Sequence, residues 1–174
     1  MLVVQKVNNL NQELENKLFS SDKGIIKDNP HISMKPSHIE HIGIAVTSLE
    51  TAISFYENVL GLKCYNIEDV PDQKVRTAFF KVGQTKIELL ESTDPEGPIG
   101  KFIEKKGEGI HHIAFSVEKI EDQLLRAEDM GVRLIDCKPR KGAEGLDIAF
   151  LHPNSTSGVL IELCENKKRL ILNI

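Results

Sequence analysis

The sequence contains no apolar run that approaches the roughly 18 residues a membrane-spanning helix requires. It also has no excess of basic residues, because 22 lysines and arginines stand against 26 aspartates and glutamates and the formal net charge is −4. A nucleic-acid-binding domain usually carries a basic face. These two absences predict that the protein has neither a membrane nor a nucleic acid as its partner.

Cysteine is scarce and unpatterned: the chain has three, Cys64, Cys137 and Cys164, at unrelated spacings. An odd number without a regular pattern argues against a disulfide framework and favours free thiols in a reducing compartment. The first residues show no basic segment followed by an apolar core, as a secretory signal would, and Glu13 and Glu15 disfavour a transit peptide. We therefore expect a cytoplasmic protein.

The length of 174 residues suits one compact domain, but residues 1–35 differ from the rest. Apolar side chains in this part recur at helical spacing and predict a short amphipathic helix. These side chains are Val3, Val7, Leu10, Leu14 and Leu18. We interpret residues 1–35 as an N-terminal extension, residues 36–166 as one domain and residues 167–174 as a C-terminal tail.

From Ile39 onward the chain repeats itself: the second half contains IHHIAFSVEKIEDQLLRAEDMGVRL, which matches IEHIGIAVTSLETAISFYENVLGLK in the first. Each copy begins with a β-rich run, continues as an amphipathic helix and reaches a glycine, Gly61 or Gly131, that ends the helix. Further strands follow, so each half reads β-α-β-β-β. Internal similarity of this kind indicates a duplicated unit. The sequence therefore predicts an α+β fold of two tandem βαβββ modules that form a cleft, residues 38–92 and 108–166.

The spacing of apolar residues also predicts the buried face of each helix. In the first helix, which Thr47 or Ser48 can cap, this face contains Leu49, Ile53, Tyr56 and Leu60. In the second helix it contains Ile120, Leu124, Ala127 and Met130. We expect the remaining strands of the second half in GVRLID, LDIAFLHP and GVLIELCE, and a short helical turn at Ile99–Lys105 in the connector.

Aligning the two halves places His41 on His112 and Glu88 on Glu162. Both histidines lie at the start of a strand, and both glutamates lie in the last strand of their module, in KIELLE and LIELCE. Strand alternation puts each histidine on the face opposite the bulky apolar residues, among small residues such as Gly43. We expect this face to leave room for a ligand.

Two histidines and two glutamates form a mixed nitrogen and oxygen donor set, which suits Zn, Ni, Co, Mn or Fe(II). A single strand histidine is more often an ordinary core-rim residue than a ligand, but the paired occurrence favours a shared site. A carboxylate on a central strand also needs a partner, because an unpaired buried charge is costly. We predict that one divalent metal ion, cobalt first and manganese, nickel or zinc as alternatives, is bound by His41, Glu88, His112 and Glu162. The remaining coordination positions would be open to water or substrate.

Three segments resemble the glyoxalase, or vicinal-oxygen-chelate, superfamily: HIGIAVTSLETAISFYENVLGL, GEGIHHIAFSVEKIEDQL and HPNSTSGVLIELCE. The similarity spans Ile39 to about Glu165, and within the superfamily it is strongest to the methylmalonyl-CoA epimerases. The resemblance implies paired βαβββ modules around one divalent metal, a CoA-thioester substrate and a homodimer. His41, His112 and Glu162 match the ligands of this family. Glu88 matches the fourth ligand, where some members carry glutamine.

The reaction implied by this resemblance interconverts (R)- and (S)-methylmalonyl-CoA through a metal-stabilised enolate. A carboxylate must remove the C2 proton, and the resemblance indicates Glu162 as a catalytic base as well as a ligand. Some members carry a second catalytic glutamate where this chain has Thr77. The second acid or base is therefore open: Glu88, a bound water or a loop residue could serve.

Other polar residues near these motifs have simpler interpretations. His111 should point to the face of the strand opposite His112 and have a structural role. Cys164 should face the same way as Glu162 and line the cavity wall. The basic loop CKPRKGAEG is either a docking place for CoA phosphates or a solvated loop.

Three other functions are compatible with parts of the pattern. A glyoxalase I-type lactoylglutathione lyase would use the same four ligands, but its last strand more often reads DPDGYKIEL, which is absent here. A ring-cleaving Fe(II) dioxygenase would use two histidines and one carboxylate and leave open the position that Glu88 fills. A metal-free small-molecule-binding module of the same fold would not need all four ligands.

Overall fold

The computed structural model describes residues 35–167. The helix predicted within residues 1–35 lies outside the described residues, and so does the predicted C-terminal tail beyond Lys167. No helix in the described part of the chain is long and apolar enough to cross a membrane.

The secondary structure of residues 35–167 follows the two predicted halves. The first half contains β1 (His38–Val46), α2 (Leu49–Asn58), β2 (Cys64–Val70), the 3-10 helix η1 (Pro71–Gln73), β3 (Val75–Val82) and β4 (Thr85–Ser92). Helix α3 (Pro98–Lys106) connects the halves, which confirms the predicted helical turn there. The second half contains β5 (Gly109–Ser116), α4 (Ile120–Asp129), β6 (Arg140–Lys141), η2 (Ala143–Gly145), β7 (Asp147–Leu151), η3 (Pro153–Ser155) and β8 (Ile161–Glu165).

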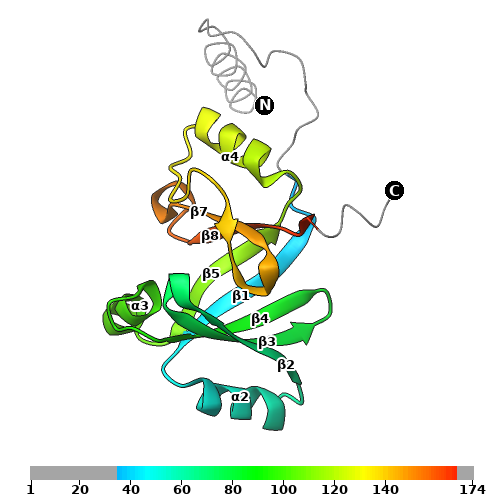
Figure 1. The fold of residues 1–174 in the computed structure, drawn as a ribbon, viewed down its shortest axis with the longest axis vertical. Coiled ribbons are helices and arrows are strands. Elements are labelled where there is room, and N and C mark those ends of the chain that lie inside the picture. Colours follow the sequence, from blue (N-terminus) through cyan, green and yellow to red (C-terminus); the bar gives the residue numbers. More distant parts are fainter. Residues whose placement is uncertain (1–34, 168–174) are drawn as a thin grey trace, which may run out of the picture. The chain divides into compact units, whose positions relative to one another are not determined.

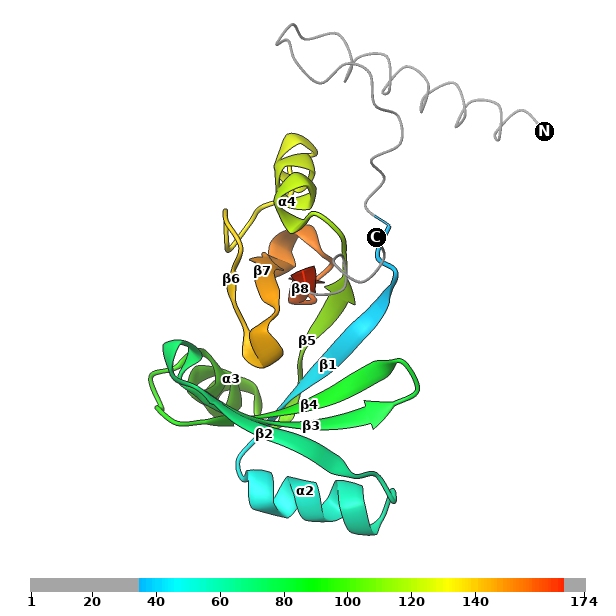
Figure 2. The same ribbon diagram turned by 45° about the vertical axis from the view of Figure 1, so that its right-hand side comes forward.

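The strands form one mixed sheet in the order β2-β3-β4-β1-β5-β8-β7-β6 (Figures 1 and 2). β1 and β5 pair antiparallel in the centre, and each pairs in parallel with the last strand of its own half, β4 or β8. Read outward from the centre, the two halves therefore have the same order. This arrangement confirms the predicted α+β fold of two tandem βαβββ modules.

Each module has its own apolar core beneath its helix. In the first module α2 covers a cluster that includes Leu49, Phe80 and Leu89. In the second module α4 covers a cluster that includes Leu124 and Leu163. Ile44 and Val46 of β1 pack in the α2 cluster, as predicted. In the second module the residue of the corresponding face that joins the α4 cluster is Val117, directly after β5.

The two helices are shorter than their apolar spacing predicts. Ser48 caps α2, because its hydroxyl accepts a hydrogen bond from the backbone N–H of Thr51. After each helix the backbone turns at a glycine in the left-handed region, with φ of +67° at Gly61 and +76° at Gly131. Leu60 and Met130 stand beyond the last helical residue, so they are 52% and 69% exposed and their predicted burial is wrong.

The prediction of a strand in GVRLID is also wrong. Only Leu134 forms a bridge there, with Leu151 of β7, and the partner strand of β7 is the two-residue β6 further along the chain. The carboxylate of Asp136 explains the interruption, because it accepts a hydrogen bond from the backbone N–H of Phe150 at 2.9 Å. A side chain thus takes the place that a backbone carbonyl would have in a regular strand.

Candidate metal centre

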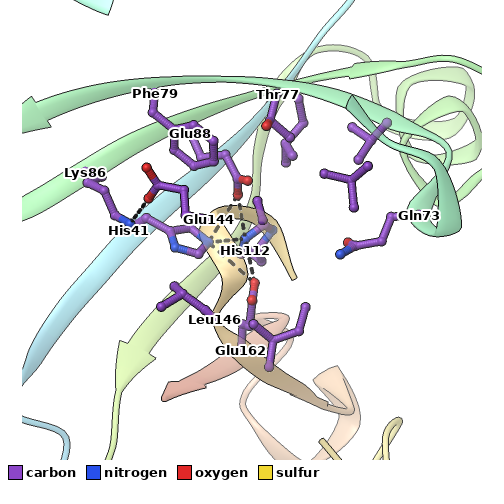
Figure 3. Close-up of a pocket in the computed structure, with 15 residues that line it drawn as sticks. His41, Gln73, Thr77, Phe79, Lys86, Glu88, His112, Glu144, Leu146 and Glu162 are labelled. Atoms are coloured by element: carbon purple, nitrogen blue, oxygen red, sulfur yellow. Dashed lines mark hydrogen bonds and ion pairs between the residues drawn. The ribbon is translucent and has the colours of Figure 1, made fainter. Parts of the chain in front are cut away.

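The four predicted ligands come from the four central strands: His41 from β1, Glu88 from β4, His112 from β5 and Glu162 from β8. Backbone pairing brings these strands into register, because Gly43 of β1 lies opposite both Glu88 and His112. The side chains point toward one another in the interior (Figure 3). Each of the four residues is only 4–5% exposed. Each module thus contributes one histidine and one glutamate to the same buried place.

The donor atoms converge on one point. His41 Nε2 lies 2.8 Å from His112 Nε2, 3.1 Å from Glu88 Oε2 and 3.4 Å from Glu162 Oε2. His112 Nε2 lies 2.9 Å from Glu162 Oε2 and 3.5 Å from Glu88 Oε2. Donors about 2.1 Å from one ion are separated by about 3.0 Å at octahedral angles and about 3.4 Å at tetrahedral angles. His41, Glu88 and His112 have donor atoms that all lie within 4.8 Å of one another, so these three could share one divalent ion. Glu162 joins them through its contacts with the two histidines.

Burial and the neighbouring charges shift the pKa values of these four side chains in opposite directions. Burial raises the pKa of Glu88, but the charges and hydrogen bonds of the two histidines outweigh it and lower the pKa to about 2. The same balance holds the pKa of Glu162 well below its ordinary value. Burial lowers the pKa of His41, but Glu88, Glu162 and Glu40 together raise it well above its ordinary value. In the absence of an ion, the two carboxylates thus hold protons on the histidines, and an ion would displace those protons.

Gly43, one of the small residues predicted on the histidine face, must lack a side chain because the His112 ring lies against it. A Cβ atom at Gly43 would lie 2.2 Å from His112 Cε1. The space predicted for a ligand on this face is therefore taken at Gly43 by the His112 imidazole.

Two β-bulges in the β1–β5 pair shape the surroundings of the histidines. In β1, Ile39 pairs with Phe115 and His41 with Ala114, so Glu40 is an extra residue. In β5 the extra residue is His111, because Gly43 pairs with His112 and Ile44 with Ile110. A bulge redirects side chains that would otherwise alternate.

The bulge overturns the expectation that His111 points away from His112. His111 Nδ1 lies 2.9 Å from His112 Nδ1, and the two rings meet edge to face. Phe102 of α3 packs on the other side of His111, with ring centroids 5.0 Å apart. Burial and the charge of His112 lower the pKa of His111 to about 4, so the imidazole is neutral at neutral pH.

Cys164 and Thr77 lie near the two predicted glutamate ligands. Cys164 is buried, and its Sγ lies 3.4 Å from Glu162 Oε1, as expected for a residue on the same face. Thr77 is 1% exposed and lines the same pocket as Glu88. Its hydroxyl donates to the backbone carbonyl of Glu68 at 3.3 Å. No carboxylate therefore stands at this position.

Two cavities reach the donor set. The smaller, of about 30 Å³, lies among the four donors and has room for little more than one ion or water molecule. The larger, of about 470 Å³, is bordered by His112 and His111 and is walled mainly by apolar residues such as Phe150 and Leu160. Arg140 of the basic loop also lines it, together with the neighbouring Lys141. The larger cavity gives a substrate access to the donors from the His112 side.

Sequence reasoning missed four polar residues at the site. Gln73 of η1 points into the pocket (Figure 3) and borders the larger cavity as well. Glu40, Lys86 and Glu144 form a chain of ion pairs beside His41. The signal for Glu40 was its place next to a predicted ligand, since second-layer carboxylates commonly hydrogen-bond metal-binding histidines.

The chain is similar in sequence to one protein superfamily and to two bacterial proteins over most of their length. Residues 40–150 match the Glyoxalase/Bleomycin resistance protein/Dioxygenase superfamily. The chain is 51% identical over 131 residues to the uncharacterised protein YqjC of Bacillus subtilis, covering 75% of this chain and 94% of that protein. It is 39% identical over 127 residues to the ethylmalonyl-CoA/methylmalonyl-CoA epimerase of Cereibacter sphaeroides, covering 72% and 95% of the two chains.

A solved structure also shows similarity to a methylmalonyl-CoA epimerase. A variant of the Streptomyces coelicolor methylmalonyl-CoA epimerase in complex with 2-nitronate-propionyl-CoA superposes with a TM-score of 0.74 at 36% sequence identity. The match covers 76% of this chain and 96% of that chain. Sequence, sheet topology and structural similarity therefore agree, and the chain belongs to the glyoxalase/bleomycin resistance protein/dioxygenase superfamily.

Proposed function

We propose that the protein is a metal-dependent epimerase that interconverts (R)- and (S)-methylmalonyl-CoA. The observation that carries the proposal is the convergence of two histidines and two glutamates on one buried point beside a cavity of about 470 Å³. Similarity to methylmalonyl-CoA epimerases over nearly their whole length in two bacterial cases supports the choice of substrate.

A divalent ion would be held by His41, Glu88, His112 and Glu162. When bound, it supplies positive charge that stabilises the thioester oxygen while the neighbouring C2 atom loses its proton. The protein's own contribution is the surroundings: the four residues are at most 5% exposed. Exclusion of water strengthens every charge interaction at this place. We name cobalt first as the native ion, with manganese, nickel or zinc as alternatives.

We assign the removal of the C2 proton to Glu162. One of its carboxylate oxygens, Oε2, contacts His112, while the other, Oε1, faces the Cys164 thiol. The depressed pKa keeps the carboxylate ionised. A second group must act on the opposite face of C2. Thr77 offers a hydroxyl rather than a carboxylate there, so the second acid or base differs from that of relatives with a glutamate.

We place the acyl part of the substrate in the larger cavity, against His112 and Phe150. Arg140 lies over the Phe150 ring, with its guanidinium carbon 5.4 Å from the ring centroid. Lys141 is 74% exposed at its side chain and pairs with Asp147. These two cations at the cavity are positioned for the phosphates of CoA, so we favour the docking interpretation of the basic loop.

The test supplies one stereoisomer of methylmalonyl-CoA and measures formation of the other by chiral separation. The hemithioacetal of glutathione and methylglyoxal serves as the competing substrate. Formation of the second stereoisomer, with no turnover of the hemithioacetal, is expected. Turnover of the hemithioacetal alone would replace the epimerase by a glyoxalase I-type lyase.

Metal content after purification separates either enzyme from a metal-free binding module. About one equivalent of a divalent ion per chain is expected for an enzyme, whereas a binding module would contain none. We also propose a homodimer, following the family resemblance. Light scattering at micromolar concentration should give twice the mass of the chain, and a monomer mass would remove this part of the proposal.

A further inference from the structure

The two histidines of the donor set differ in the side chain that contacts Nδ1, the ring nitrogen that faces away from the other donors. The bulge residues Glu40 and His111 occupy equivalent positions of the repeat, one before each histidine. Glu40 Oε2 lies 2.5 Å from His41 Nδ1, whereas His111 offers only another imidazole to His112 Nδ1, at 2.9 Å. Only His41 therefore has a carboxylate on the nitrogen that faces away from the other donors.

Glu40 is itself held by charge. Lys86 Nζ lies 2.5 Å from Glu40 Oε1 and 2.5 Å from Glu144 Oε2. The three side chains are 13–22% exposed, so their charges are poorly screened by solvent. One carboxylate oxygen of Glu40 thus lies on the Lys86 ammonium and the other on His41 Nδ1, and the ammonium favours the carboxylate form.

The ion-pair chain links the two modules. Lys86 belongs to β4 of the first module and Glu144 to η2 of the second. Figure 3 shows the two side chains beside His41. The backbone N–H of Glu144 also donates to Glu68 Oε2 at 3.0 Å. Glu144 has a φ of +54°, a conformation that non-glycine residues adopt only when surrounding contacts hold it. The η2 turn is thus fixed against the His41 side of the site.

The positions of the second module that are equivalent to Glu40 and Lys86 carry other residue types. The repeat pairs Lys86 with Leu160, each two residues before a ligand glutamate, and Glu40 with His111. Leu160 and His111 line the cavity of about 470 Å³ and carry no carboxylate. The ion-pair chain is therefore not a consequence of the duplicated fold, because it stands behind His41 and has no counterpart behind His112.

We propose that Glu40 is a positioning residue for His41, and that Lys86 and Glu144 hold it in place. An ionised carboxylate can only accept a hydrogen bond, so Nδ1 of His41 must carry the proton. When an ion displaces the proton of Nε2, the lone pair of this nitrogen is free for the ion, on the side of Glu88, His112 and Glu162. Metal-binding histidines commonly donate their other N–H to a carboxylate in this way. The inference rests on the proposed metal centre and adds a function for three residues outside the ligand set.

The test titrates cobalt(II) into the metal-free protein and follows the visible absorption of the bound ion. Glu40→Ala should weaken cobalt binding by roughly 10- to 100-fold, the usual effect of removing such a partner. Glu40→Gln keeps a hydrogen-bond acceptor for Nδ1–H and should restore most of the affinity. Glu91→Gln is the matched control, because Glu91 is a half-buried glutamate of β4 whose side chain has no hydrogen bond or ion pair among the described residues.

A second readout separates positioning from stability. Nitrogen NMR of the histidine rings should show His41 protonated at Nδ1 in the cobalt-free wild type at alkaline pH and a mixture of tautomers in Glu40→Ala. A loss of fold stability alone would not change this ratio. Equal cobalt affinities for Glu40→Ala and Glu91→Gln would overturn the positioning role. Failure of the wild type to bind cobalt would overturn the metal centre, and the positioning role with it.

Discussion

At the scale of single residues, Gly43 determines how closely the two modules can approach at the donor set. It lies opposite Glu88 on one side and His112 on the other. The His112 ring occupies the place where a side chain at this position would begin. The absence of a Cβ atom therefore lets His112 reach His41 and Glu162.

Gly43→Ala should displace the His112 ring. We expect it to destabilise the protein by about 1–3 kcal/mol, the usual range for overpacking, and to weaken cobalt binding. Gly61→Ala is the control, because Gly61 has a φ of +67° but no atom within 4 Å of the place a Cβ atom would occupy, so the change strains the backbone without touching the donors. Urea unfolding and cobalt titration of both variants give the comparison. Unaltered cobalt affinity in Gly43→Ala would show that His112 does not depend on this contact.

The repeat allowed the positions of the four donors to be predicted, because equivalent strands place His41 and His112, and Glu88 and Glu162, on equivalent faces. The sequence also predicted that they share one site, and the structure gives the distances between them. Glu40 and His111 could not be placed, since strict alternation assigns them to the other face and a bulge depends on cross-strand register. Register is a property of two strands together, which one strand's sequence does not contain.

At the scale of secondary structure elements, α4 shows where apolar spacing ceases to be informative. Ile120, Leu124 and Ala127 follow the predicted face and are at most 2% exposed. Met130 continues the same spacing but caps the helix, next to Gly131, and is 69% exposed. Periodicity predicted the face correctly, whereas the end of the helix is determined by the glycine.

Truncations on α4 should differ sharply in cost. Leu124→Ala removes a side chain that is 2% exposed and should cost about 2–5 kcal/mol of unfolding free energy. Met130→Ala changes an exposed position and should cost less than about 0.5 kcal/mol. Urea unfolding midpoints measure both. Similar losses for the two variants would mean that Met130 is buried after all.

Local sequence also failed to separate a strand from a loop after α4. Val132 and Leu134 alternate as a strand would, and both pack partly against the α4 core. The Asp136 carboxylate nevertheless takes a backbone donor of β7, so regular pairing does not develop. Asp136 and Phe150 are 14 residues apart in the sequence, so the local sequence around Asp136 does not reveal that its side chain binds this backbone N–H.

At the scale of the whole molecule, the donor set joins the modules. Each module supplies one histidine and one glutamate, and His41 Nε2 of the first module lies 2.8 Å from His112 Nε2 of the second. Neither half alone has four donors. Binding of an ion should therefore stabilise the folded protein, because the unfolded chain does not present the donors together.

This stabilisation should increase with pH. The pKa values of His41 and His112 are raised in the metal-free fold, so their contribution to its stability is complete below the ordinary histidine pKa and is lost as pH rises through the raised values. An ion must displace those protons, so its affinity rises over the same interval. The difference in melting temperature between cobalt-loaded and chelated protein should be larger at about pH 8 than at about pH 6. A difference that does not change with pH would argue against histidine ligation.

The most direct measurement of the proposed chemistry is uptake of deuterium at C2 of methylmalonyl-CoA in D₂O, by chelated and by cobalt-loaded protein. We predict rapid uptake that requires the ion, persists in Glu91→Gln and is lost in Glu162→Gln. Uptake at the same rate without the ion, or undiminished uptake in Glu162→Gln, would contradict a metal-dependent epimerase in which Glu162 removes the proton.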